Sequence, residues 1–214
     1  MRTSEKQRRN HRPRFPPWFS LIFILLMGAG YTVLDLLQPS EPLLTILSFV
    51  PGAASFVALS ATRHPQGTRS SYIRLRKLSI RGGVALGAAT VLLLPILGSS
   101  SGFAGWRWIP ALVYAPASGI AQELYFRASL LPVLESAVTS NPIYAVSLHS
   151  FVFVVFHLRT FFSIPSLPIL LLVIVVLFSA GCAWGYEVQK DRTVVWAMVQ
   201  HSMFLIVMSM FAWA

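Results

Sequence analysis

Long apolar runs separated by short polar stretches dominate the pattern of hydrophobic and polar positions along the chain. Most of these runs approach the roughly 20 apolar residues that a helix needs to cross the hydrocarbon core of a bilayer. Helices pair their backbone polar groups within one segment, as the water-free bilayer interior requires, and the runs lack the alternation of a membrane barrel. The pattern predicts an all-α, polytopic transmembrane helical bundle of about seven spans: Trp18–Leu37, Leu43–Thr62, Gly83–Gly98, Trp108–Phe126, Ile143–Leu158, Leu167–Glu187 and Val194–Trp213.

Composition agrees with a membrane location and limits the number of domains. Of the 214 residues, 55% are hydrophobic and 11% are charged, whereas soluble domains carry about 25% charged residues. The length suits one helical domain, residues 18–214, preceded by a basic tail, residues 1–17. The first apolar run is long enough to span, so we expect a retained helix and not a cleaved signal peptide.

The net charge of +10 is concentrated beside apolar runs, with six basic residues within residues 1–17 and six more within residues 63–81. Basic clusters that flank spans follow the positive-inside rule and usually meet lipid headgroups. We therefore expect membrane lipids as partners and no nucleic acid. A cytoplasmic N-terminus puts 15 of the 17 basic residues inside and leaves Arg107 and Arg159 outside. This split predicts a plasma-membrane protein with its N-terminus in the cytoplasm and its C-terminus outside.

Ionisable residues inside apolar runs are costly, and in membrane spans they usually mark functional sites. Four stand out: Glu123, Arg127, His157 and His201. Taken alone, Glu123 and Arg127 have the i,i+4 spacing of a structural ion pair, and His157 alone is as compatible with a contact between helices as with catalysis. We interpret His149 as structural or interfacial. Three carboxylates near predicted span ends, where a charge costs little, are assigned no chemistry: Asp35, Glu135 and Glu187.

The spacing of these residues predicts that they converge. Glu123 and His157 are equidistant from residue 140, which lies in a turn-like Thr-Ser-Asn-Pro run, so a hairpin folded there puts them at one level. At a rise of 1.5 Å per residue, His201 lies about 9–16 Å beyond the turn that follows the sixth span. All three residues are therefore expected in the cytoplasmic half of the bilayer.

Two details of this arrangement concern packing. Gly181 and Gly185 form a small-xxx-small pair on the sixth span, and we expect them to allow close approach to the seventh span near His201. Arg159 falls one turn beyond His157, which puts a guanidinium inside the apolar layer, an unfavourable position.

Three short motifs in this region share their order and spacing with one family. The stretch Gln122-Glu123-Leu124-Tyr125-Phe126-Arg127 resembles a motif of two adjacent glutamates, three spacers and an arginine. Phe153 stands four residues before His157, and His201 stands four residues before Leu205. With these motifs the chain resembles the CAAX prenyl protease and bacteriocin-processing family of intramembrane endopeptidases over about residues 108–205.

The resemblance implies a helical bundle around a polar chamber that opens to the cytoplasm, and peptide hydrolysis by a glutamate-activated water without metal or cofactor. Carried over by position, the family's catalytic base falls on Gln122 and its second glutamate on Glu123. The arginine falls on Arg127, the two histidines on His157 and His201, and the oxyanion-binding asparagine on Leu205. By ligand type alone, two histidines and a carboxylate are also compatible with a metal site.

Two departures from the family pattern affect the chemistry. A glutamine amide cannot act as the base, which contributes roughly 10²–10⁴ in rate, and a leucine cannot donate to an oxyanion, which costs about 10²–10³. The first hypothesis is an endopeptidase acting on a peptide or membrane protein, with Glu123, His157 and His201 catalytic and with supporting residues Gln122, Arg127 and Phe153. The alternative is a non-catalytic pseudoprotease that serves as a scaffold, immunity or assembly factor. A small transporter, the third possibility, usually has an internal repeat, which this sequence lacks.

Overall fold

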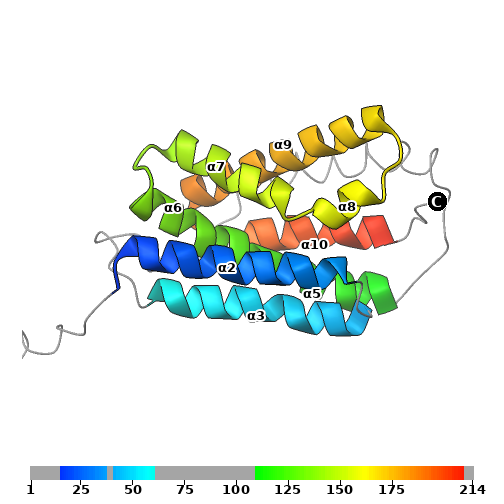
Figure 1. The fold of residues 1–214 in the computed structure, drawn as a ribbon, viewed down its shortest axis with the longest axis horizontal. Helices are drawn as coiled ribbons and strands as arrows, with labels where there is room; N and C mark the ends of the chain where they lie inside the picture. Colours follow the sequence, from blue (N-terminus) through cyan, green and yellow to red (C-terminus); the bar gives the residue numbers. More distant parts are fainter. Residues whose placement is uncertain (1–14, 38–40, 61–108, 210–214) are drawn as a thin grey trace, which may run out of the picture.

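The computed structural model describes residues 15–37, 41–60 and 109–209 (Figure 1). The predicted span Gly83–Gly98, the basic cluster within residues 63–81 and nearly all of the basic tail lie outside the described residues. Every element within the described part is helical, which confirms the all-α fold class.

The helices follow one another with short connections. They are α2 (Pro17–Leu36), α3 (Glu41–Ser60), α5 (Ala115–Tyr125), α6 (Leu131–Ala137), α7 (Pro142–Val155), α8 (Leu158–Phe162), α9 (Leu167–Asp191) and α10 (Val195–Ser209). Two π-helical turns, η1 (Pro110–Tyr114) and η2 (Phe126–Leu130), adjoin α5 at its two ends. The segment from η1 to α6 is therefore one long, irregular helical rod.

The irregularity of this rod has a cause in the sequence. Pro116 and Pro132 each lie two residues after the end of a π-helical turn. Proline lacks the backbone N–H and its ring clashes with the preceding turn, so the helix widens locally and does not keep regular i→i−4 bonds. The hydroxyl of Ser129 donates to the carbonyl of Leu124 at 2.8 Å and satisfies one of the backbone groups in η2.

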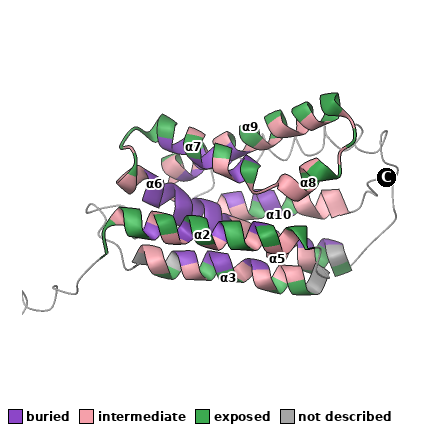
Figure 2. Ribbon diagram, viewed as in Figure 1, coloured by how far each residue is buried: buried purple, intermediate pink, exposed green. Residues whose placement is uncertain are grey.

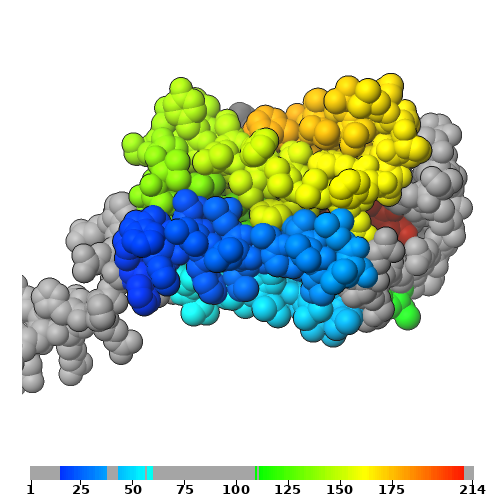
Figure 3. All heavy atoms as spheres, in the orientation of Figure 1, coloured from blue at the N-terminus to red at the C-terminus, as the bar shows by residue number. Residues whose placement is uncertain are grey.

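The rod is the centre of the bundle. It packs against α3 and α10, α2 packs against α3 and α6, and α7 packs against α9. Figure 2 shows that buried residues are concentrated along the rod, whereas α2 and α9 carry many exposed positions. In Figure 3, α2 runs across one face between α3 and the pair α7 and α8.

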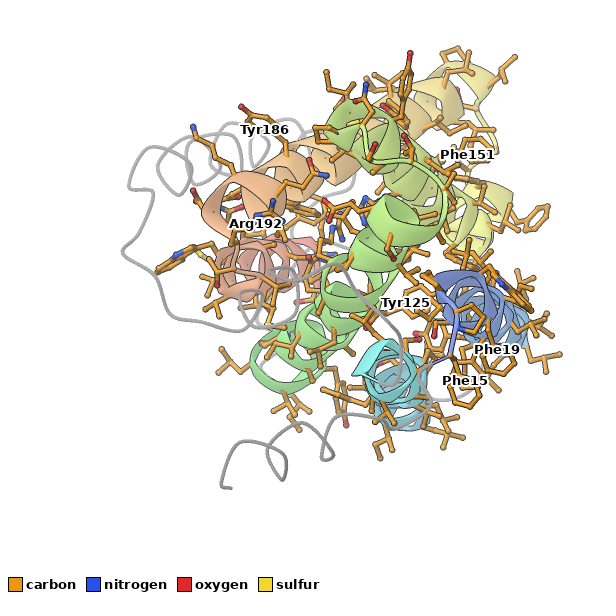
Figure 4. The ribbon with its side chains drawn as sticks, turned by 90° about the vertical axis from the view of Figure 1, so that its left-hand side faces the viewer. Phe15, Phe19, Tyr125, Phe151, Tyr186 and Arg192 are labelled. Carbon is orange, nitrogen blue, oxygen red and sulfur yellow. The ribbon has the colours of Figure 1, made fainter. Side chains whose placement is uncertain are left out.

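Two described helices, α2 and α9, are long and apolar enough to cross a membrane by length and composition. Only 22% and 11% of their most apolar windows are buried, which is unlike the core helix of a soluble protein. Figure 4 shows Phe151 and Tyr186 pointing away from the bundle, and the two residues are 59% and 62% exposed. Such a surface suits an apolar surrounding.

The seven-span prediction is not confirmed. Within the described residues, the helices expected over Ile143–Leu158 and Val194–Trp213 are shorter than predicted, at 14 and 15 residues for α7 and α10. Helix α7 ends at Val155 because the chain leaves the helical conformation at His157, where φ is −101° and ψ is 24°. Residues 210–214 lie outside the described part of the last predicted span.

The turn predicted around residue 140 is present between α6 and α7. Asn141 caps α7, because its side chain accepts a hydrogen bond from the backbone N–H of Ile143 at 3.0 Å. Gln189, near the end of α9, donates to Glu135 at 2.7 Å and to the carbonyl of Pro142 at 3.3 Å. The α6–α7 turn and the end of α9 therefore lie at the same end of the bundle, as Figure 1 also shows.

Two packing predictions are corrected. Arg159 does not lie unpaired in an apolar layer: it reaches the opposite end of the bundle and donates to Asp35 of α2 at 2.9 Å. A Cβ added at Gly181 would meet Ser150 at 3.0 Å, and one at Gly185 would meet Val146 at 3.2 Å. The glycine pair on α9 thus allows close approach to α7, not to the last helix, because the face of α9 that carries it is turned toward α7.

Candidate active site

Glu123 is the centre of a buried polar cluster. It lies on α5 with no exposed surface, and its Oε1 accepts hydrogen bonds from Arg127 Nη1 at 2.6 Å and from His201 Nδ1 at 2.7 Å. Two donors therefore hold one oxygen of the carboxylate. The other oxygen, Oε2, is buried and has no hydrogen-bond partner within the described residues.

Arg127 is fully buried in the π-helical turn that follows α5. Aromatic rings surround its guanidinium, with centroids 4.4, 5.2 and 5.7 Å from Cζ: Phe153, Trp184 and Phe126. Buried cation–π contacts of this kind contribute about 2 kcal/mol or more. The ion pair that the i,i+4 spacing of Glu123 and Arg127 predicts is present in the structure. Two of the three rings around Arg127 come from other helices, Phe153 from α7 and Trp184 from α9.

His201 is fixed on α10 by contacts on two sides. Its ring stacks on Trp184 of α9, with centroids 4.7 Å apart and planes inclined by 25°. Its neighbour Ser202 lies against Gly119 of α5, where an added Cβ would meet Ser202 Cα at 2.9 Å. Glycine at this position permits the backbone approach that puts His201 within hydrogen-bond distance of Glu123.

His157 lies at the break between α7 and α8. Its Nδ1 contacts the carbonyl oxygen of Phe153 at 2.7 Å, one of the carbonyls that the end of α7 leaves without an intrahelical partner. The two rings are 4.5 Å apart, and Phe153 is also 6.0 Å from the ring of His201. The structure thus brings the predicted residues Glu123 and His201 into contact, with His157 across the ring of Phe153.

The hydrogen bonds of His157 and His201 determine which ring nitrogen of each remains available to a water or substrate. A carbonyl or carboxylate oxygen accepts, so Nδ1 donates in both His157 and His201, and Nε2 is the remaining nitrogen in each. In a neutral imidazole this Nε2 carries a lone pair and accepts. His201 can therefore donate to an oxyanion from Nε2 only as an imidazolium.

The two positions that depart from the family pattern show no substitute contact with the cluster. Gln122 donates from Nε2 to Ser118 at 3.2 Å, and its Oε1 is buried without a partner among the described residues. Leu205 is partly buried on α10, one turn after His201. The amide oxygen of Gln122 is able to hold a water but not to take its proton.

Three residues near the cluster were not recognised from sequence as part of it: Trp184, Gly119 and the fully buried His149. His149 packs edge-on against Phe126 at 6.1 Å, and neither of its ring nitrogens has a hydrogen-bond partner within the described residues. Its burial agrees with a structural interpretation but not with an interfacial one. Among the described residues, no three histidine, cysteine or carboxylate side chains form a group suited to a metal ion.

Comparison with known proteins identifies the region that carries this cluster. The sequence profile of the family described as type II CAAX prenyl endopeptidase Rce1-like matches residues 104–207. No curated protein and no solved structure matches the chain. The matched region contains all three motifs and every residue of the Glu123 cluster, and the two departures lie inside it. This match to residues 104–207 agrees with the resemblance of the same region to the CAAX prenyl protease and bacteriocin-processing family.

Proposed function

We propose that this chain is an intramembrane endopeptidase of low turnover, in which Glu123 activates the hydrolytic water. One observation carries the proposal: Glu123 Oε2 is buried and has no partner within the described part of the chain, on a carboxylate whose other oxygen is held by Arg127 and His201. An unpaired buried carboxylate oxygen is costly. A water bound at Oε2 would remove this cost and would lie next to a base of fixed orientation.

The reaction that these groups support begins when Glu123 Oε2 takes a proton from the bound water. The water oxygen then forms a bond to the carbonyl carbon of the substrate, and the negative charge develops on the carbonyl oxygen. His201, as an imidazolium, donates to that oxygen from Nε2. The C–N bond then breaks as the proton on Glu123 passes to the leaving nitrogen, which restores the carboxylate. His157 has its Nε2 available to hold the water or the substrate.

Two features of the cluster limit the rate. Arg127 and His201 both donate to Oε1 of Glu123, so only Oε2 is left to take the proton of the water. Leu205 provides no second donor to the oxyanion, a loss of about 10²–10³ in rate. We therefore expect measurable but slow cleavage.

The test uses purified protein in liposomes and a fluorogenic peptide that ends in a farnesylated CAAX sequence, with the same peptide unprenylated as a second probe. Glu123→Gln is expected to abolish cleavage, a loss of about 10²–10⁴, while Glu135→Gln, a carboxylate at the end of α6, leaves it unchanged. Gln122→Glu combined with Leu205→Asn is expected to raise turnover by at least one order of magnitude. Cleavage that survives Glu123→Gln would overturn the proposed mechanism.

A second candidate function, a pseudoprotease that binds a peptide or membrane helix without cutting it, is favoured by the pair Gln122 and Leu205. Under this hypothesis the wild type cleaves neither peptide, and the double reversion is also inactive. Binding of the farnesylated peptide, measured by fluorescence anisotropy in both proteins, would then distinguish a chamber that still accepts the peptide from one that has changed shape.

We further propose that the bundle crosses the membrane with the N-terminal end of α2 on the cytoplasmic side. Tyr125 donates to the carbonyl of Ile24 at 2.8 Å, next to the cluster. Ile24 is seven residues into α2, about 10 Å along the helix, so this orientation puts the cluster within the cytoplasmic half of the apolar layer. A cysteine introduced at position 70 in a Cys182→Ala background is expected to resist impermeant maleimides in intact cells. Labelling from outside would exclude this orientation and the proposed plasma-membrane topology.

A further inference from the structure

A second carboxylate approaches the cluster from α9. Glu187 is half-buried, although it lies on a span-length apolar helix. Its Oε1 accepts a hydrogen bond from α10, and Asp191, the last residue of α9, lies one helical turn further along. From sequence it was assigned no chemistry because it lies near the end of a span. The structure puts it between the end of the bundle and the buried cluster.

A glutamine connects Glu187 to the cluster. Gln200 on α10 is 5% exposed and donates from Nε2 to Glu187 Oε1 at 3.3 Å. The next residue along α10 is His201, which donates to Glu123. The amide oxygen of Gln200 is buried and, within the described residues, has no hydrogen-bond partner.

Polar groups therefore continue from the end of α9 to the fully buried Glu123, and two of them have an unpartnered acceptor: Gln200 Oε1 and Glu123 Oε2. Buried polar groups in proteins are paired with other groups or with ordered water. On α9 at this level, Val188 is apolar, whereas the indole N–H of Trp184 is buried and has no partner among the described residues. Water that reaches Glu123 along α9 would therefore meet two unpartnered acceptors and one unpartnered donor.

We infer that Glu187 and Gln200 line the route by which water reaches Glu123 from the end of the bundle where α9 ends. This inference rests on the proposed function, because hydrolysis consumes one water per turnover: its oxygen enters the new carboxylate and one of its protons goes to the leaving nitrogen. Glu187 is a positioning residue in this scheme. It holds Gln200 and keeps the route polar, and it does not touch the reacting atoms.

The test compares three variants with the wild type. Glu187→Leu removes the polar group, Glu187→Gln keeps a hydrogen-bond acceptor for Gln200, and Glu135→Leu is the matched control. Glu135 is a carboxylate at the same end of the bundle that also accepts from a glutamine of a neighbouring helix, Gln189, at 2.7 Å. The first readout is exchange of the His201 C2 hydrogen for deuterium, followed by mass spectrometry over a range of pH. Its plateau rate at high pH reports access of water to the ring.

In Glu187→Leu the plateau rate at His201 is expected to fall about tenfold, the factor that corresponds to one lost hydrogen bond of a buried polar group. Glu187→Gln and Glu135→Leu are expected to stay within about twofold of the wild type on the same scale. Gln200→Leu should reproduce the effect of Glu187→Leu. The inference would be overturned if the plateau rate at His201 were unchanged in both Glu187→Leu and Gln200→Leu. It would also be overturned if the plateau rate fell equally in Glu135→Leu.

The second readout is turnover of the farnesylated peptide, where kcat should fall about tenfold in Glu187→Leu and recover in Glu187→Gln with KM unchanged. The two readouts separate the two claims. A wild type that cleaves nothing contradicts the proposed function, yet the exchange rates still decide whether water follows this route. If the exchange rate at His201 falls in Glu187→Leu as expected but kcat does not change, the route is not used in catalysis.

Discussion

Replacing Gly119 by alanine is expected to separate α10 from α5 and to break the contact on which the candidate site depends. The added Cβ would lie 2.7 Å from Ser202 Oγ and 2.9 Å from both Ser202 Cα and Ser202 N. Two of these three atoms belong to the backbone, so a side-chain rotation cannot relieve the clash. Helix α10 as a whole has to move.

The size of the movement follows from these distances. Ordinary contact begins at 3.4 Å, so the backbone of Ser202 has to retreat by at least 0.5 Å from its 2.9 Å position. His201, its neighbour, moves with it. The His201–Glu123 hydrogen bond is 2.7 Å long, and the same shift stretches it to about 3.2 Å, the long end of the typical range for such bonds. Overpacking of this kind typically costs about 1–3 kcal/mol.

The matched control is Gly30→Ala. An added Cβ at Gly30 has nothing within 4 Å, so only the intrinsic helix preference changes. That preference favours alanine by roughly 0.5–1 kcal/mol. Thermal unfolding in detergent should therefore show a lower midpoint for Gly119→Ala and an equal or higher midpoint for Gly30→Ala.

The activity readout depends on the proposed function and is measured separately. A misplacement of reacting groups by up to 1 Å costs on the order of 10²-fold, so cleavage of the farnesylated peptide should fall by about one to two orders of magnitude in Gly119→Ala. If Gly119→Ala unfolds at the same temperature as Gly30→Ala, the close approach of α5 and α10 described above is wrong. If Gly119→Ala is destabilised but cleaves at the wild-type rate, the hydrogen bond from His201 to Glu123 is not needed for cleavage.

Two further predictions concern the charges and the unpartnered groups of the cluster. Arg127→Leu leaves Glu123 buried with one donor fewer and should cost about 3–5 kcal/mol. Because Glu123→Gln removes the charge that needs the partner, the double variant should be destabilised by less than the sum of the two single variants, and additive effects in unfolding would show that the two side chains do not interact. His149→Leu removes from a buried position two ring nitrogens that have no partner among the residues described, so it should leave stability unchanged or raise it by about 1 kcal/mol. A loss of more than about 2 kcal/mol in chemical denaturation would instead mean that His149 has a partner, such as an ordered water.

The sequence alone predicted the all-α fold class, the family resemblance of the matched region, and the ionisable residues Glu123, Arg127 and His201 of the cluster. These features are local or additive along the chain. Helices form from hydrogen bonds four residues apart, apolar composition is a sum over a segment, and the family motifs are short patterns of fixed spacing. The turn near residue 140 was predictable for the same reason, because Asn141 and Pro142 start a helix wherever the chain goes next.

Only the tertiary structure decided which atoms meet. One residue along a helix is a rotation of 100°, so the face that a side chain presents depends on how neighbouring helices pack, and that packing involves residues far apart in sequence. The glycine pair of α9 faces α7, Arg159 pairs with Asp35 across 124 positions, and His157 lies at a helix break. The same reason explains why the sequence indicates only a charge near a span end at Glu187 and not its link to the cluster. Its link to the cluster arises only when α10 packs beside α9, because its hydrogen-bond partner Gln200 lies on α10.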